Sequence, residues 1–170
     1  MASQFPHIIW WCPQLPPSPK AAAALIADGT AHWPANRMAV IGSSLGGFYA
    51  TWLAALRGCK AALLNPAIDP ARDLAKYIGE QTAWHDPAER FYFAPEFVDE
   101  LRALDVGPLP HPERAWALIA KGDEVLDWRE MTVRYAGSQQ VVMEGGDHAI
   151  SDFESHMPQV LAFLNLQPAP

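Results

Sequence analysis

Short apolar runs alternate along the chain with longer segments whose apolar residues have helical spacing, and this alternation constrains the possible folds most strongly. It is typical of parallel βαβ units, in which helices cover both faces of a buried sheet. We expect strands at 7–12, 37–42, 60–65, 115–122 and 139–144. We expect helices at 21–33, 44–58, 70–78, 128–136 and 151–164, with a further helical pattern at 96–105. The sequence therefore predicts an α/β fold with a mostly parallel sheet, in a single domain that covers residues 1–170.

The charge composition argues against two classes of partner. Charged residues make up 18% of the chain and the net charge is -7, so there is no basic stripe for phosphate backbones or anionic lipid. We therefore expect neither nucleic acid nor a membrane as a partner. No apolar run approaches the roughly 20 residues of a membrane helix, and the first residues lack the basic segment of a signal peptide, which predicts a cytoplasmic protein. Cys12 and Cys59 indicate neither a disulfide framework nor a metal site.

The helix expected at 44–58 has an apolar stripe. Phe48, Trp52, Ala55 and Leu56 follow the spacing i, i+4, i+7 and i+8, which predicts one buried face. Gly58 is expected to end this helix, because glycine adopts the left-handed conformation common at helix C-termini.

The segment 79–112 is too long for a short crossover and too rich in aromatic residues for a disordered linker. Long excursions within a compact domain are usually lids or walls of a binding site. Two interpretations stay open for its aromatic side chains. Phe91, Tyr92, Phe93 and Phe97 either anchor the excursion to the core or contact a substrate.

The strongest motif is Gly42-Ser43-Ser44-Leu45-Gly46, which lies between a predicted strand and a predicted helix. In that context a G-x-S-x-G motif forms a sharp turn that holds the serine at the carboxyl edge of the sheet, while its glycines allow backbones to approach closely. The amide of Leu45 would then point to where an oxyanion forms, and the helix N-terminus would favour that negative charge. We therefore predict that Ser44 is a nucleophile. The alternative is that Ser43 and Ser44 only cap the helix.

A serine nucleophile needs a histidine base and a carboxylate that orients it. His148 follows Gly145-Gly146-Asp147 at the end of a predicted strand, which is the position such a base requires. The other histidines lie before a strand, in or after helices, or in the excursion, and are expected to be ordinary surface residues: His7, His32, His85, His111 and His156.

Three carboxylates follow the strand predicted at 115–122, and Asp123 is the preferred acid. It comes directly after the glycine that ends the strand, whereas Asp127 is placed to cap the next helix. The chain order is then Ser44, Asp123, His148, which is the order of the α/β-hydrolases.

These residues lie within longer blocks that resemble the YqiA-like esterase family of the α/β-hydrolase superfamily. The blocks are CPQLPPSP at 12–19, IGSSLGGFYATWLA at 41–54, LLNPAIDP at 63–70, KGDEVLDWRE at 121–130 and EGGDHAISDFE at 144–154. The resemblance implies a three-layer α/β-hydrolase fold and hydrolysis of short, small-molecule acyl esters without a cofactor or metal. It also implies that Ser44, Asp123 and His148 form the catalytic triad, that Leu45 contributes to the oxyanion hole, and that LLNPA lines the floor beside the nucleophile.

One departure from the family concerns an early strand. Its members normally contain a strand that ends in His-Gly-Phe and carries the second oxyanion amide, and this chain has no such sequence. The expected sheet is therefore N-terminally shortened, either because the strand belongs to sequence before Met1 or because 7–12 pairs directly with 37–42. The sequence predicts a serine carboxylesterase or thioesterase, and the alternative is a catalytically weak or inactive hydrolase-like protein that binds a ligand or partner.

Overall fold

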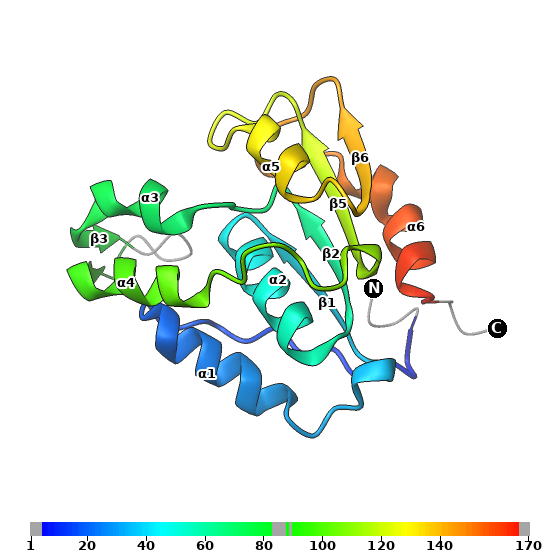
Figure 1. Cartoon of the computed structure of the whole chain (residues 1–170), viewed down its shortest axis with the longest axis horizontal. Coiled ribbons are helices and arrows are strands. Elements are labelled where there is room, and N and C mark those ends of the chain that lie inside the picture. The colour runs from blue at the N-terminus through cyan, green and yellow to red at the C-terminus, as the bar shows by residue number, and fades with distance from the viewer. Residues whose placement is uncertain (1–4, 83–87, 89, 167–170) are drawn as a thin grey trace.

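The central sheet of the protein has four parallel strands. The computed structural model describes residues 5–82, 88 and 90–166 (Figure 1). The strands lie side by side in the order β1-β2-β5-β6. Their bounds are Ala39–Ser43 for β1, Lys60–Leu64 for β2, Ala115–Ala120 for β5 and Gln139–Met143 for β6. Four of the five predicted strands are therefore confirmed.

Helices cover both faces of this sheet. On one face, Met131 and Tyr135 at α5 (Trp128–Arg134) pack with Ala117 and Ile119 of β5. On the other face, α6 (Phe153–Leu164) contributes Val160 and Leu164 to a cluster with Trp116 and Leu118 of β5 (Figure 1). Every residue of β5 is buried, as expected for a strand enclosed in three layers.

Helix α2 (Leu45–Arg57) covers the same face as α5, against β1 and β2. The other helices in the described part of the chain are α1 (Pro19–Thr30), α3 (Pro70–Leu74), α4 (Pro95–Leu104) and three short 3-10 helices at Ala35–Arg37, Ala75–Tyr77 and Pro112–Arg114. None of the helices in the described part of the chain is long and apolar enough to cross a membrane.

The buried face of α2 differs from the predicted stripe. Phe48 is buried as expected, but Leu56 is 57% exposed. Tyr49 and Leu53 pack with α1 and α4, and Ala50 packs with the sheet cluster. Because α2 is covered from two sides, its buried residues do not follow a single stripe. The prediction for the helix end is confirmed, since Gly58 is left-handed with φ 66°.

The strand predicted at 7–12 is absent, and this expectation was wrong. Residues 9–16 have no regular secondary structure, and β1 is the edge of the sheet. Trp11 lies against Trp33 and Gly29 of α1, while Ile9 is 78% exposed. A strand needs a neighbour that shares its backbone hydrogen bonds, and no such bond joins this segment to the open edge of β1 among the described residues. The sheet is thus shortened, as predicted, but 7–12 does not pair with β1.

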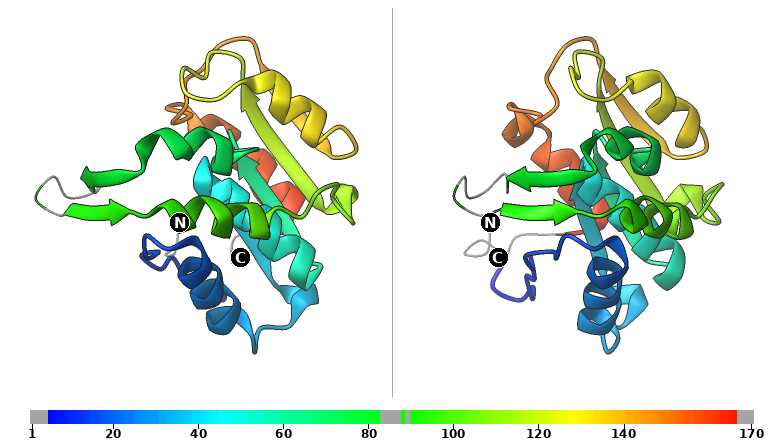
Figure 2. Two further views of the ribbon diagram at one scale, coloured as in Figure 1. Left: turned by 60° about the vertical axis from the view of Figure 1, so that its left-hand side comes forward. Right: turned by 90° about the vertical axis from the view of Figure 1, so that its left-hand side faces the viewer.

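The excursion at 79–112 contains an antiparallel hairpin followed by α4. Strands β3 (Gly79–Thr82) and β4 (Arg90–Phe93) pair with each other and extend away from the central sheet (Figure 2). Phe93 and Phe97 contact each other edge to face and join the same apolar cluster as α1 and α2. Phe91 packs against that cluster, whereas Tyr92 is 58% exposed. The contacts of the three phenylalanines therefore favour the anchoring interpretation.

Candidate active site

Ser44 occupies a strained turn between β1 and α2. Its φ of 53° and ψ of -123° lie in a region that non-glycine residues rarely adopt, at a cost of roughly 1–3 kcal/mol. Backbone hydrogen bonds hold the turn: the Ser44 amide donates to the Leu64 carbonyl at 3.0 Å, and the Ser44 carbonyl accepts from the amides of Gly47 and Ala67 at 2.9 Å each and from Phe48 at 3.3 Å. The Ser44 side chain makes no capping hydrogen bond to α2. The alternative that Ser44 only caps the helix is therefore not supported by this geometry.

The turn can close because Gly42 and Gly47 have no side chains. Gly42 was predicted from the motif, and Gly47 was not. A Cβ atom at Gly42 would lie 2.2 Å from the carbonyl oxygen of Gly46, so no larger residue fits there. A Cβ atom at Gly47 would lie 2.7 Å from Cβ of Pro66. At Gly46 a Cβ atom would meet nothing within 4 Å, so Gly46 takes part in the predicted close approach through its carbonyl group but does not itself need to be glycine.

This difference gives a prediction about stability. Gly42→Ala should lower the free energy of unfolding by more than about 2 kcal/mol, because the added methyl overlaps backbone that cannot move away. Gly46→Ala should change it by less than about 1 kcal/mol, and in the stabilising direction, since alanine favours the first turn of α2. Urea unfolding of both variants measures the difference. Equal stability of the two variants would contradict the close approach at Gly42.

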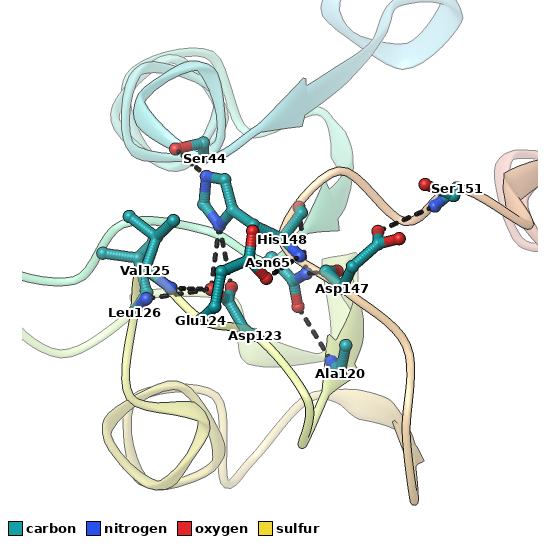
Figure 3. Close-up of polar contacts among 10 residues, drawn as sticks. All are labelled: Ser44, Asn65, Ala120, Asp123, Glu124, Val125, Leu126, Asp147, His148 and Ser151. Atoms are coloured by element: carbon teal, nitrogen blue, oxygen red, sulfur yellow. Dashed lines mark hydrogen bonds and ion pairs between the residues drawn. The ribbon is translucent and has the colours of Figure 1, made fainter.

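His148 contacts Ser44 with one ring nitrogen and Asp123 with the other. Its Nε2 lies 2.9 Å from Ser44 Oγ, and its Nδ1 lies 2.9 Å from Asp123 Oδ2 and 3.0 Å from Oδ1 (Figure 3). The predicted contacts between the three side chains are therefore present. With the Nδ1 proton directed at Asp123, Nε2 is free to accept the Ser44 hydroxyl proton.

Asp123, and not Asp127, is the carboxylate that meets the imidazole. The Asp123 side chain is fully buried, and its Oδ1 also accepts the amides of Val125 and Leu126 at 2.8 and 2.9 Å. These donors compensate for the loss of water around a buried carboxylate. Asp127 instead accepts the Arg129 amide at 2.9 Å and caps α5, as predicted.

Neighbouring backbone fixes the loops that carry the acid and the base. The Lys121 and Gly122 amides donate to the carbonyls of Met143 and Gly145, at 3.0 and 3.2 Å. On the other side of the base, the Asp147 carboxylate reaches past His148 and accepts the Ser151 amide at 2.9 Å. Hydrogen bonds from Ser151 lower the pKa of Asp147. The two loops are therefore held at one edge of the sheet.

Two residues for which the sequence predicted no contact with the base also bind the His148 backbone. The Glu124 carboxylate accepts the His148 amide at 3.0 Å, and the Asn65 side chain donates to the His148 carbonyl at 3.1 Å. The resemblance places Asn65 on the floor beside the nucleophile, and its buried side chain binds the carbonyls of Asp147 and His148 in the loop after β6. Its position directly after β2 was the available signal, because the carboxyl ends of parallel strands share one edge of the sheet.

The amide of Leu45 is the first of α2, and the structure gives it no hydrogen-bond acceptor among the described residues. First-turn amides of a helix have no partner within the helix, so this one is available to a ligand. Within residues 5–82, 88 and 90–166 there is no group of three or more histidine, cysteine or acidic side chains placed to hold a metal ion.

Comparison with known proteins identifies relatives for most of the chain. A family model described as an uncharacterised protein family, UPF0227, matches residues 1–165. A UPF0227 protein of Shewanella sediminis is 26% identical over 125 residues, which are 73% of this chain and 63% of that relative. The chain thus spans less than two thirds of the relative's length.

Solved structures with similar folds are α/β-hydrolases. Alpha/beta hydrolase domain-containing protein 10 from mouse is 16% identical with a TM-score of 0.56, over 84% of this chain and 70% of that one. The esterase domain of a Rhodothermus marinus protein is 20% identical with a TM-score of 0.55, over 84% of this chain and 64% of that one. At these identities the likeness shows the fold alone, and it confirms the predicted α/β-hydrolase fold.

Proposed function

The chain belongs to UPF0227, the YqiA-like family that its sequence blocks resemble, and from this premise we propose that it is a serine hydrolase acting on short acyl esters or thioesters. The observation that carries the proposal is the continuous set of contacts from Asp123 through His148 to a strained Ser44. Esterases among the structural neighbours support the same class of reaction.

The reaction follows from the contacts of these three residues. His148 Nε2 takes the proton of Ser44 Oγ as the oxygen attacks the acyl carbon. The tetrahedral intermediate collapses when His148 returns this proton to the leaving alcohol or thiol, which leaves an acyl group on Ser44. Water, deprotonated by His148, then attacks the acyl carbon, and His148 returns the proton to Ser44 Oγ as the acyl–oxygen bond breaks, which releases the carboxylic acid and regenerates Ser44. Asp123 holds the ring and stabilises its positive charge in both steps.

Leu45 is the proposed donor to the oxyanion. Its amide begins α2, so the helix N-terminus adds a favourable potential at the same point. The proposal is tested by measuring hydrolysis of para-nitrophenyl acetate and butyrate, together with a short acyl thioester. We expect saturable turnover of at least one of them, and no turnover above the buffer rate for any of the three would contradict the proposal.

The open edge of β1 favours a second candidate, a weakly active or inactive hydrolase-like binding protein. Ala39 and Ile41 are exposed on this strand, and no described strand pairs with its outer edge. In the α/β-hydrolases a further strand lies beside the strand that precedes the nucleophile. The loop after that further strand supplies the second oxyanion amide. A site that lacks it retains the three side chains but stabilises the tetrahedral intermediate less well.

An added strand discriminates between these candidates. An apolar strand that ends in His-Gly-Phe, joined through a helix-forming linker ahead of Met1, should raise kcat by about one to three powers of ten, because one oxyanion donor typically has an effect of this size. The measurement compares kcat and the thermal midpoint with those of a matched extension whose turn is Ala-Ala-Ala. Equal kcat for both extensions would contradict the proposed deficit of a second donor.

A further inference from the structure

Asn65 joins three strand ends of the sheet through one buried side chain. It follows β2 directly, is fully buried, and has a φ of 38°. Its Oδ1 accepts the amide of Ala120, the last residue of β5, at 2.8 Å. Its Nδ2 donates to the carbonyls of Asp147 and His148, at 2.9 and 3.1 Å, in the loop that follows β6 (Figure 3).

These partners require an amide side chain at this position. A backbone amide can only donate and a carbonyl oxygen can only accept, so the contacts of Ala120, Asp147 and His148 fix which end of the Asn65 side chain is oxygen and which is nitrogen. A carboxylate of the same shape could still accept from Ala120, but it would face two carbonyl oxygens without a proton to share. Asparagine also tolerates the left-handed backbone conformation better than most residues.

Residues 144–151, the base loop, make hydrogen bonds on both sides of His148, but only two side chains hold the His148 backbone itself. Gly145 and Gly146 precede it, and glycine permits many backbone conformations. The His148 amide donates to Glu124, whose side chain is exposed and therefore competes with water. The His148 carbonyl accepts from Asn65, whose side chain water does not reach. The buried hydrogen bonds of Asn65 are thus the firmer of the two attachments.

We propose that Asn65 is a positioning residue, which fixes the His148 loop to the ends of β2 and β5 so that Nε2 stays within reach of Ser44. The inference rests on the proposed function for its effect on turnover. The effect on the loop itself does not depend on catalysis. Asn65 does not contact Ser44, so it acts through His148 and not on the reacting atoms.

The first test separates turnover from substrate binding. Asn65→Asp should lower kcat for para-nitrophenyl acetate by about 10- to 100-fold, since a displacement on the order of 1 Å at a catalytic group has an effect of this size. KM should change by less than about threefold, because Asn65 is buried away from any bound ester. Asn65→Gly loses all three side-chain hydrogen bonds, while glycine adopts the same φ without strain. It should likewise lower kcat and leave KM nearly unchanged.

The chain offers a matched control at Asn165. This residue is also left-handed, with φ 58°, and it ends α6. Two residues earlier, the Phe163 carbonyl accepts a hydrogen bond from the Lys60 ammonium at the start of β2, which is the edge of the sheet opposite to Ser44. Asn165→Asp makes the same chemical change far from Ser44, so it should leave kcat within about twofold of the wild type.

The second test measures the loop without any reaction. Amide hydrogen exchange followed by mass spectrometry should show faster exchange across 145–150 in both Asn65 variants than in Asn165→Asp, under conditions where all three proteins are folded. If the wild type hydrolyses no ester, the proposed function fails while this measurement still decides the role of Asn65. Unchanged exchange across 145–150, or a fall in thermal midpoint with wild-type kcat, would overturn the proposal.

Discussion

Replacing Ser44 by alanine should lower kcat/KM for short para-nitrophenyl esters by about 10⁴- to 10⁶-fold, the range expected when a nucleophile is removed from a working serine triad. The variant keeps the fold, because the strained turn is held by backbone hydrogen bonds and not by the Ser44 hydroxyl. Alanine at φ 53° is no less suited to the turn than serine. The measurement is initial-rate hydrolysis with protein whose folded state is verified by thermal unfolding.

Ser43 provides the matched control for this variant. It is the adjacent serine of the same motif, lies exposed at the end of β1, and its side chain makes no hydrogen bond to any described residue. Ser43→Ala should leave kcat/KM within about threefold of the wild type, a change of well under 1.4 kcal/mol in the barrier. Comparable losses in the two serine variants, or retention of a tenth of the activity by Ser44→Ala, would contradict the assignment.

The second large effect is expected at Asp123. Asp123→Asn should lower kcat by about 10⁴-fold, because an amide in place of the acid favours the wrong tautomer of His148 and does not stabilise the imidazolium. The carboxylate is fully buried and meets Nδ1 at 2.9 Å, so no water replaces it. KM should change much less than kcat. Steady-state kinetics on the same esters measures both constants.

Asp127→Asn makes the same substitution four residues later and serves as its control. Asparagine caps helices about as well as aspartate, so α5 should keep its start and kcat should stay within about threefold of the wild type. If Asp127→Asn loses activity and Asp123→Asn keeps it, the acid has been wrongly assigned.

The contacts of Ser44, Asp123 and His148 could be predicted from sequence because each residue follows an apolar strand of a parallel sheet. The carboxyl ends of such strands meet at one edge, so local signals in three distant segments imply one location. A glycine before Asp123 and two before His148 marked where each strand ended. The choice between Asp123 and Asp127 followed from the same reasoning, because a cap and a strand end place their carboxylates differently.

Other features depended on partners that local sequence does not reveal. The run 7–12 has the composition of a strand, but a strand forms only where a neighbour accepts its hydrogen bonds. Leu56 was expected in the core because a single stripe was assumed for a helix that packs on two sides. Asn65 meets residues that are 55 to 83 positions away, so its place after a strand indicates the edge of the sheet where it lies but not which groups it binds.

The central claim is that His148 activates Ser44 as a nucleophile, and covalent labelling tests it most directly. The protein is treated with a fluorophosphonate, digested, and analysed by peptide mass spectrometry, in parallel with Ser44→Ala and His148→Ala. We predict one modified residue, Ser44, in the wild type, no label in Ser44→Ala, and labelling slower by at least about 10³-fold in His148→Ala. Modification of a different residue, or equal labelling of Ser44 with and without His148, would contradict the account.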